Sequence, residues 1–204
     1  IDVDLTGITA YSVAAGDLNG DGHPDIVIGT SSSRDSYFYP WDSSGNNGFL
    51  AATTLVGSDT YNTEAVLIED FNRDGHMDIV LGNFPAENFI YINEGDADPF
   101  DAVTPVNISA DTGRTVSLAS ADIDLNGYPE IYAGNSGGRN RLYWNDNDAT
   151  PFPGGPAVDI DFDDKDTNAI KCADLNRDGL PDVIQAVNGN NMIHPYDMSV
   201  GYLQ

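Results

Sequence analysis

The sequence is poor in cysteine, in basic residues and in long apolar runs, and each shortage excludes a class of protein. Cys172 is the only cysteine, so the chain can form neither an internal disulfide nor a cysteine-ligated zinc site. Eight Lys and Arg residues stand against 33 Asp and Glu residues, which gives a formal net charge of −25. Because nucleic acids and anionic membranes are bound through clustered cations, we expect neither as a partner. No apolar run approaches the roughly 20 residues of a membrane helix, so we expect no membrane span.

Residues that favour turns and strands are abundant. The 204 residues include 21 Gly, 11 Pro and 10 Tyr, and 40% of them are hydrophobic, which suffices for a buried core. Gly and Pro favour turns, whereas Tyr and β-branched residues favour strands. We therefore predict an all-β chain that forms a single domain over residues 1–204.

One acidic phrase occurs four times at a nearly constant spacing. The copies begin at residues 17, 70, 122 and 174, so successive starts are 53, 52 and 52 residues apart. The copies are Asp17 to Asp25 (DLNGDGHPD), Asp70 to Asp78 (DFNRDGHMD), Asp122 to Glu130 (DIDLNGYPE) and Asp174 to Asp182 (DLNRDGLPD). A period near 50 residues is typical of propeller blades, in which each repeat forms one four-stranded sheet.

Four strand-like runs recur around each phrase. An alternating run such as Val13 and Ala15 precedes it, and an apolar run such as Ile26 to Ile28 follows it, before two further runs. We predict a four-bladed β-propeller of four-stranded antiparallel blades, with repeats at about 9–55, 56–108, 109–162 and 163–204. The N-terminal segment 1–8 resembles a fourth strand, and we expect it to close the last blade. The alternative is a fragment of a longer array with an unpaired strand at each end.

Each phrase places oxygen-bearing side chains at alternate positions. Positions 1, 3, 5 and 9 supply three carboxylates and one amide oxygen, and Gly at position 6 provides a sharp turn. Ca²⁺ takes about 6 to 8 oxygen ligands in a flexible geometry, whereas Mg²⁺ requires a tighter octahedron, so the loop favours calcium. We predict four Ca²⁺ sites that also use the main-chain carbonyl at position 7. The predicted ligands are Asp17, Asn19, Asp21, His23, Asp25, Asp70, Asn72, Asp74, His76, Asp78, Asp122, Asp124, Asn126, Tyr128, Glu130, Asp174, Asn176, Asp178, Leu180 and Asp182.

Two other interpretations of the phrase fit less well. Asp-Gly and Asn-Gly also form hairpin turns, but a turn does not require acids at positions 1 and 9, where unneutralised carboxylates would repel. An EF-hand loop begins similarly but needs an acid at position 12, where this chain has Ile28, Leu81, Ala133 and Gln185. The phrase is therefore predicted to join two antiparallel strands of one blade.

The strands that follow the phrases also repeat, as DIVIG at Asp25 to Gly29 and DIVLG at Asp78 to Gly82, and NRLYWND stands at Asn140 to Asp146. With the four phrases, these segments resemble the FG-GAP/VCBS repeats of integrin-α-type β-propellers over essentially the whole chain. The resemblance implies calcium in the loop between the first and second strands of each blade. The family usually builds seven blades, so four blades depart from its commonest size.

Ligand binding is expected at the end of the blades opposite the calcium loops, where the remaining loops gather. Four of the eight basic residues lie on or beside these loops, namely Arg34, Arg114, Arg139 and Arg141. Because guanidinium groups pair with carboxylates, they predict recognition of an acidic sugar or a peptide carboxylate. The alternative is that they only pair with nearby acids.

Aromatic residues of the third strands provide a second candidate surface. Alignment of these strands places Tyr39, Tyr91, Tyr143 and His194 at one position and Trp41, Asn93, Asn145 and Tyr196 at another. Aromatic rings beside Asp and Asn are typical of sugar-binding surfaces, which favours a lectin-like module, although packing between blades is the alternative. The residues assigned to ligand binding are Arg34, Tyr39, Trp41, Arg114, Arg139, Arg141, Tyr143, His194 and Tyr196.

Catalysis and protein adhesion are the alternative functions. The sequence has no GxSxG and no HExxH motif, and we assign no catalytic residue. His194, Tyr143 and either Arg139 or Arg141 would be the base, acid and charge neutraliser of a lyase acting on acidic polysaccharides. An adhesion module resembling the integrin head would instead bind a protein through the same face. The acidic loops suit millimolar Ca²⁺, so we expect a secreted, extracellular or periplasmic protein that binds a carbohydrate or an extracellular protein.

Overall fold

The structure is a computed structural model of the 204-residue chain. It describes residues 9–31, 35–42, 44, 48–55, 61–96, 98–147, 151–152, 157–160, 166–189, 191–197 and 202–203, of which 196–197 and 202–203 are described for the backbone only. The described residues form strands β1 to β17 and no helix, so the predicted all-β class is confirmed.

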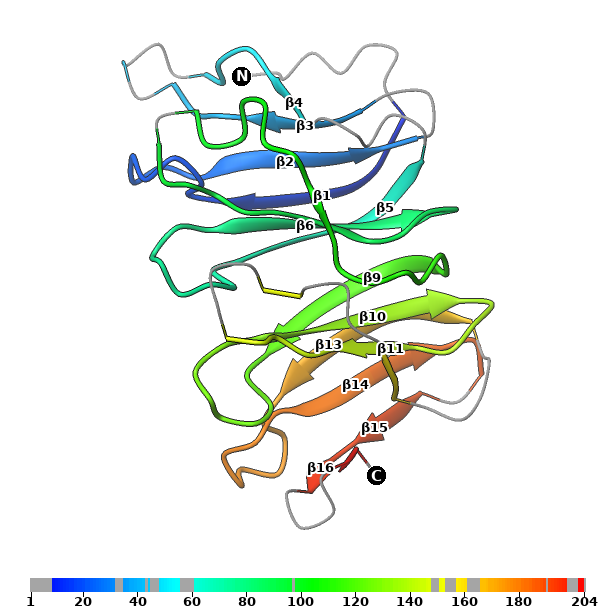
Figure 1. The fold of residues 1–204 in the computed structure, drawn as a ribbon. Coiled ribbons are helices and arrows are strands. Elements are labelled where there is room, and N and C mark those ends of the chain that lie inside the picture. The colour runs from blue at the N-terminus through cyan, green and yellow to red at the C-terminus, as the bar shows by residue number, and fades with distance from the viewer. Residues whose placement is uncertain are drawn as a thin grey trace.

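The strands form antiparallel sheets that follow one another in chain order (Figure 1). Blade 1 consists of β1 (Ala10–Gly16), β2 (Asp25–Thr30), β3 (Ser36–Tyr39) and β4 (Thr53–Leu55), and blade 2 of β5 (Asn62–Glu69), β6 (Asp78–Phe84), β7 (Phe89–Tyr91) and β8 (Val106–Asn107). Blade 3 consists of β9 (Arg114–Ala121), β10 (Glu130–Ser136), β11 (Arg141–Tyr143) and β12 (Val158–Asp159), and blade 4 of β13 (Thr167–Ala173), β14 (Asp182–Val187) and β15 (Met192–His194). Strands β16 (Tyr196–Asp197) and β17 (Tyr202–Leu203) pair separately.

The predicted four-bladed propeller architecture is confirmed. Blades 1 to 3 each have four strands, and blade 4 has three within the part of the chain that the structure describes. The segment 1–8, which we expected to supply the fourth strand of blade 4, lies outside the described residues.

The acidic phrase occupies the same place in every blade, between the first and second strands. The residue pairs that close the four hairpins are Gly16 with Asp25, Glu69 with Asp78, Ala121 with Glu130 and Ala173 with Asp182. The acid at position 9 is thus the first residue of each second strand. The prediction that the phrase joins two antiparallel strands of one blade is confirmed.

The hydrophobic core lies between the blades. The second strands are covered on both faces, as the continuous apolar runs predict, and six of the seven residues of β6 are buried. Three apolar clusters each join two consecutive blades. The clusters contain Phe38 and Phe100 between blades 1 and 2, Phe71 and Phe152 between blades 2 and 3, and Tyr132 and Ile170 between blades 3 and 4. The blades therefore depend on their neighbours for stability, and blades 1 and 4 lie at opposite ends of the molecule (Figure 1).

Candidate functional site

The four acidic loops share one backbone conformation. Position 4 has a positive φ of 73°, 60°, 58° and 66° in blades 1 to 4, and the Gly at position 6 has φ between 85° and 97°. Residues other than Gly rarely adopt backbone φ values near 90°, which explains why every copy has Gly at position 6. The carboxylate at position 1 accepts the N–H of that Gly at 2.9 to 3.0 Å in all four loops. The turn and the first acid are therefore fixed together.

The acid at position 9 is buried and joins the loop to the rest of the blade. One of its oxygens accepts the N–H of the position-2 residue at 2.8 to 3.0 Å in all four copies. In blades 1 and 2 the second oxygen accepts an N–H from the residue beyond the third strand, Trp41 at 2.7 Å and Asn93 at 2.9 Å. Position 9 therefore contributes to the fold through these hydrogen bonds as well as to any metal site.

Burial changes the ionisation of these acids. Desolvation raises the pKa of Asp78 and of Glu130 to about 7, against the lowering effect of their backbone hydrogen bonds, and neighbouring loop carboxylates raise both further. Desolvation also raises the pKa of Asp25. A bound cation would favour the ionised form of each group, so the loops are electrostatically suited to a positive ligand.

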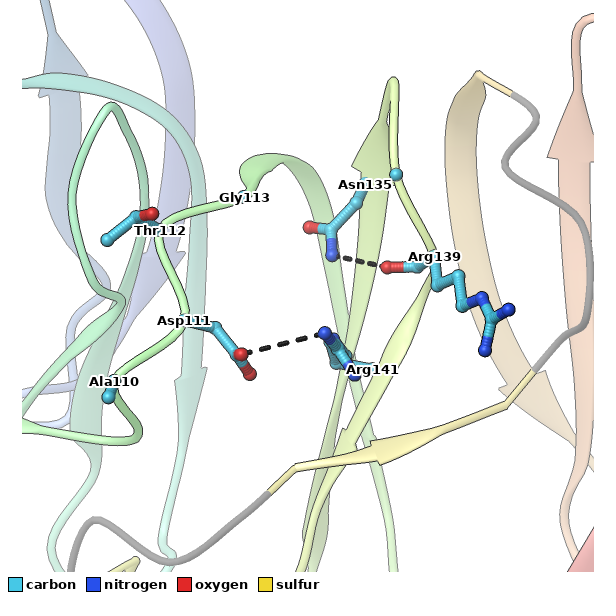
Figure 2. A pocket seen from close by; sticks show the side chains of 8 residues that line it. Ala110, Asp111, Thr112, Gly113, Asn135, Arg139 and Arg141 are labelled. Carbon is cyan, nitrogen blue, oxygen red and sulfur yellow. Dashed lines mark hydrogen bonds and ion pairs between the residues drawn. The ribbon is translucent and has the colours of Figure 1, made fainter.

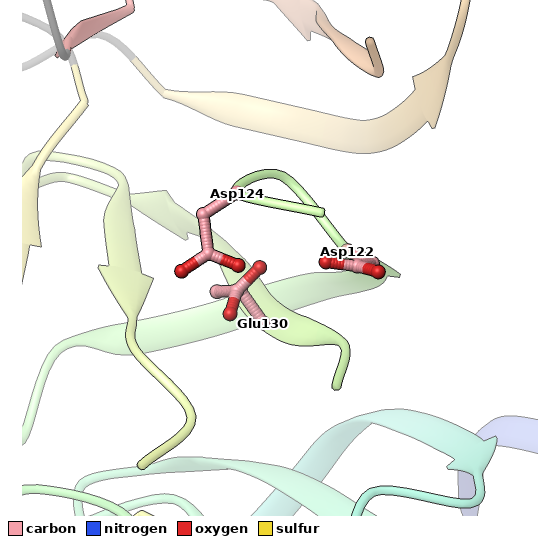
Figure 3. A group of neighbouring side chains, drawn as sticks. All are labelled: Asp122, Asp124 and Glu130. Carbon is pink, nitrogen blue, oxygen red and sulfur yellow. The ribbon is translucent and has the colours of Figure 1, made fainter. Parts of the chain in front are cut away.

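The third loop brings three acids together. Asp122, Asp124 and Glu130 each have an oxygen within 4.8 Å of the others (Figure 3). The loops also contain buried carboxylate oxygens without a hydrogen-bond partner, namely Asp70 Oδ1, Asp122 Oδ1, Glu130 Oε1 and Asp182 Oδ1. Buried polar atoms are normally paired, and oxygen-only donor sets suit hard cations. The third loop is therefore a candidate cation site, and the ligand sets of the other three loops stay predictions.

A pocket lies at the other end of blade 3. It has a volume of about 330 Å³, and we call it the blade-3 pocket (Figure 2). Its lining residues come from the loop before β9 and from the end of β10 through the start of β11. They are Ala110, Asp111, Thr112, Gly113, Asn135, Gly138, Arg139 and Arg141. The structure thus brings two of the predicted ligand-binding arginines, Arg139 and Arg141, to one pocket.

The arginines of this face are paired with acids. Arg139 lies 2.5 Å from a carboxylate oxygen of Asp159, which also pairs with Arg141. A second nitrogen of Arg141 lies 3.6 Å from Asp111 across the pocket. The charges of the pocket therefore largely compensate one another.

Arg114 and Arg34 do not join this group. Arg114 is outside the pocket lining and donates to both carboxylate oxygens of Glu64, at 2.9 and 3.1 Å. Arg34 lies outside the described residues.

The aromatic part of the predicted ligand surface needs correction. Tyr39 and Tyr143 are buried, and the Tyr143 hydroxyl accepts a hydrogen bond from Asn88, so neither ring face is open to a sugar. Trp41 lies at the acidic-loop end of its blade and not at the predicted ligand-binding end. Its backbone N–H donates to Asp25, and its ring centroid is 6.1 Å from that of His23 in the acidic loop.

The remaining members of the predicted set give little support to the lyase alternative. His194 lies on β15 of blade 4, outside the residues that line the blade-3 pocket, and the side chain of Tyr196 is not described. Burial raises the pKa of Tyr143 to about 12, and the hydroxyl of this core residue is not positioned to reach a substrate.

The sequence interpretation missed a buried chain of Asn and Thr side chains that links blades 2 to 4. Its hydrogen bonds run from Thr63 to Asn83 at 2.9 Å, from the N–H of Asn83 to Asn88 at 3.0 Å, and from Asn88 to Thr115 of blade 3 at 3.0 Å. The chain continues in blade 3, where Thr115 donates to Asn135 and the N–H of Asn135 donates to Asn140. Thr167 of blade 4 then donates its hydroxyl to Asn140. The repeated Gly-Asn of Gly82-Asn83 and Gly134-Asn135 was the available signal.

Four successive antiparallel blades, each with an acidic loop between its first two strands, define a β-propeller of the acidic-loop type. A model of the FG-GAP-like repeat matches residues 17–81, 70–133 and 122–184, and the chain belongs to this family.

Comparison with individual proteins agrees with this assignment. Integrin alpha-7 of Homo sapiens is 25% identical over an alignment of 150 residues, and the match covers 64% of this chain and 12% of that protein. A solved structure described as BBS1N in complex with ARL6DN, soaked with lead, is similar in fold, with a TM-score of 0.57 and 11% identity. The match covers 96% of this chain and 50% of that chain. None of the described residues forms a helix of the length and apolarity that a membrane crossing requires.

Proposed function

We propose that this chain is an extracellular binding module for carbohydrate, with calcium at one end of its blades and ligand at the other. The blade-3 pocket is the observation that carries the proposal. It presents the acceptor Asp111 opposite the donors of Arg141, and the peptide groups of Gly113 and Gly138 line it as well. Sugar hydroxyls both donate and accept hydrogen bonds, so a pocket with both kinds of group suits them. Its volume of about 330 Å³ is in the range of small-ligand sites.

The charge balance of the pocket favours a neutral sugar over an acidic one. Asp159 already neutralises part of the charge on Arg139 and Arg141. An anionic ligand would have to compete with this carboxylate and approach a chain of net charge −25. A neutral polyol needs neither condition, because it can add hydrogen bonds to ion pairs that stay in place.

We assign a Ca²⁺ ion to each of the four acidic loops, bound by the side chains at positions 1, 3, 5 and 9 and the carbonyl at position 7. Support comes from the common loop conformation, the oxygen-only donors and the unpaired buried oxygens. The ions hold the hairpins and reduce repulsion, because four of them change the formal charge from −25 to −17. An extracellular location fits this role, since calcium is millimolar there and integrin alpha-7 is a relative.

A glycan array probed with the calcium-loaded chain tests the proposal. We expect binding to neutral glycans, and we expect Asp111→Ala and Arg139→Ala to weaken the affinity for the best glycan by about 10-fold or more, as lost charge-assisted hydrogen bonds should. Arg114→Ala is the matched control, because Arg114 is another half-exposed, ion-paired arginine of blade 3 outside the pocket. An array without any bound glycan, or equal affinities for the three variants, would contradict the proposal.

Protein adhesion is the second candidate, favoured by the similarity to integrin alpha-7. The same face would then bind an extracellular protein. A blank glycan array together with binding of the chain to cell-surface protein that is lost in Arg139→Ala and kept in Arg114→Ala would support this candidate over carbohydrate.

A further inference from the structure

A second pocket lies in blade 2, along the connection between its third and fourth strands. It has a volume of about 400 Å³, and we call it the blade-2 groove. Its lining comes from the segment directly after β7 and from the segment that leads into β8. The lining includes Ile92, Glu94, Asp101, Val103, Thr104 and Val106. None of these residues lines the blade-3 pocket, so the two sites are separate.

The apolar floor of the groove is anchored in the core on both sides of blade 2. Ile92 packs against the cluster that joins blades 2 and 3, and Val103 packs against the cluster that joins blades 1 and 2. Val106, the first residue of β8, is 38% exposed. The groove therefore combines a fixed floor with an accessible apolar side.

The backbone on both sides of the groove is held in place. Asn93, which precedes Glu94, donates its side-chain amide to the carbonyl oxygen of Leu18 in blade 1 at 2.7 Å. Phe100, which precedes Asp101, is buried in the core between blades 1 and 2. A site whose backbone is already ordered has a smaller entropic cost of binding, so the groove is preorganised for a ligand.

The charge of the groove is negative and uncompensated. Glu94 and Asp101 are exposed, and neither carboxylate has a hydrogen-bond or ion-pair partner within the part of the chain that the structure describes. The groove lining contains no basic residue. In the blade-3 pocket, by contrast, Asp111 pairs with Arg141. The blade-2 groove therefore favours a positively charged ligand.

The apolar part of the lining favours an organic cation over a metal ion. Ca²⁺ takes about 6 to 8 oxygen ligands, and the side chains of the groove offer two carboxylates and the Thr104 hydroxyl. Val103 and Val106 have no oxygen in their side chains. A lysine side chain buries its methylene stem on apolar surface and keeps its ammonium group among polar groups. The valines and the two acids together match these two parts.

The pair of acids is particular to blade 2. Asp146 of blade 3 corresponds to Glu94, because each follows the Asn that comes after the third strand. Pro153 of blade 3 corresponds to Asp101, because each follows a Pro-Phe dipeptide. A structural role shared by the blades would not require acids in one blade alone, which favours a role in recognition.

We propose that the blade-2 groove binds a basic segment of a partner protein, with a lysine ammonium group at Glu94 and Asp101 and its methylene stem on Val103 and Val106. β8 is the outer strand of its sheet, and its second edge has no strand partner among the described residues. An extended segment beside this edge gains backbone hydrogen bonds, which favours a polypeptide over a free amine. The proposal does not depend on what the blade-3 pocket binds.

A nuclear magnetic resonance titration of the isotope-labelled, calcium-loaded chain tests the proposal. The probe is a short peptide of alternating threonine and valine with one central lysine. The reference peptide has norleucine, an uncharged residue with a similar stem, in place of the lysine. In about 0.15 M salt, which screens the long-range field of the chain, we expect the lysine peptide to shift the amide signals of residues 92–106. We expect the norleucine peptide to bind about 10-fold more weakly or worse.

Three outcomes of the titration would overturn the proposal. These are the absence of shifts in residues 92–106, shifts spread over the acidic loops of all blades, and equal affinities for the two peptides.

Substitution of the acids tests their role. Glu94→Gln and Asp101→Asn keep the shape of each side chain and remove its charge, so we expect each to weaken binding of the lysine peptide by about 5-fold or more. Asp146→Asn is the matched control, because Asp146 is an exposed acid at the position of blade 3 that corresponds to Glu94. Circular dichroism checks that the variants fold. Equal affinities for the three variants would overturn the proposal.

The apolar contact has its own matched pair of variants. We expect Val106→Asn to weaken binding by about 3-fold, because the lysine stem loses apolar surface. Val158→Asn is the control, since Val158 is the first residue of β12 as Val106 is of β8, and it is 37% exposed. Equal affinities for these two variants would remove the apolar stem from the proposal and overturn it in this form.

Calorimetry separates a basic ligand from a metal ion. We expect Glu94→Gln and Asp101→Asn to bind as many calcium ions as the unmodified chain. One calcium fewer in both variants would show that the groove holds a metal ion, which would overturn the proposal. Binding of glycans by the blade-3 pocket is unaffected by either result, so the two proposals fail independently.

Discussion

The two ends of the blades differ in how strictly they repeat. At the acidic-loop end, all four copies keep three carboxylates, the glycine at position 6 and its hydrogen bond to position 1. At the opposite end, blade 3 has Arg139 and Arg141 where blade 2 has Glu87 and Phe89. Features that recur in every blade are expected to have a structural role that every blade shares, which here is to stabilise the hairpin between the first and second strands. A feature that occurs in one blade gives that blade a property of its own. The proposed function accordingly places stabilising calcium ions at the loop end and ligand recognition at the opposite end, called the recognition end below.

Calcium removal should have the largest effect of any single treatment. An ion present at 100 times its dissociation constant contributes about 2.7 kcal/mol, so the four proposed sites together would contribute about 11 kcal/mol. For a chain of this size, each kcal/mol corresponds to about 2 to 4 °C. We therefore expect exhaustive EDTA treatment to lower the melting temperature by more than about 20 °C, measured by circular dichroism. Recovery on adding Ca²⁺, but not equimolar Mg²⁺, is the control. An unchanged melting temperature would disprove the structural role of calcium.

The recognition end has a repeated structural layer beneath its variable loops. Asn88 accepts the N–H of Asn83 and donates to Thr115 in the buried chain of side chains between blades. Asn88→Ala would leave the buried N–H of Asn83 without this acceptor and would remove the donor to Thr115, whose hydroxyl keeps its bond to Asn135. We therefore expect a loss of about 1 to 3 kcal/mol in chemical denaturation. Asn191 is the matched control, because it accepts the N–H of Val187 in the same way but is exposed. Equal losses in Asn88→Ala and Asn191→Ala would show that the buried chain adds nothing.

A single acidic loop can be tested without removing all metal. Asp122→Asn keeps the shape of a side chain in the third loop but removes one of its three carboxylates. We expect calorimetry to count one calcium fewer and the free energy of unfolding in calcium to fall by about 2 to 3 kcal/mol. Asp101→Asn, an exposed acid outside the loops, should change neither quantity. An unchanged calcium count in Asp122→Asn would show that the carboxylate of Asp122 is not needed to bind an ion in the third loop.

The sequence predicted what is local and repeated, and it failed where position depends on contacts between segments. The spacing of acids around Gly22 and its three counterparts gave the hairpin, its place between two strands and the number of blades. Alignment put Tyr39 and Tyr143 at one position, but period alone does not say that both sides of a third strand are covered by neighbouring blades. Arg141 pairs with Asp159 because the two residues lie opposite each other in the register of β11 with β12. The length of the segment between these strands does not predict that register. The predicted position of Trp41 was wrong for a similar reason. Its backbone N–H donates to Asp25 at the start of β2, a contact between two strands that the sequence alone does not reveal.

The smallest effects should come from the charged side chains of the recognition end. The Arg114 to Glu64 pair has good geometry, but the Arg114 side chain is about half exposed, and such pairs contribute about 0 to 1 kcal/mol. We expect Arg114→Ala and Arg139→Ala each to lower the free energy of unfolding by less than about 1 kcal/mol in urea denaturation with calcium present. The side chains of this end would then be free to vary without loss of the fold, as sites of recognition require. A loss above about 2 kcal/mol for Arg139→Ala would give the pocket a structural role and remove the contrast between the two ends of the blades.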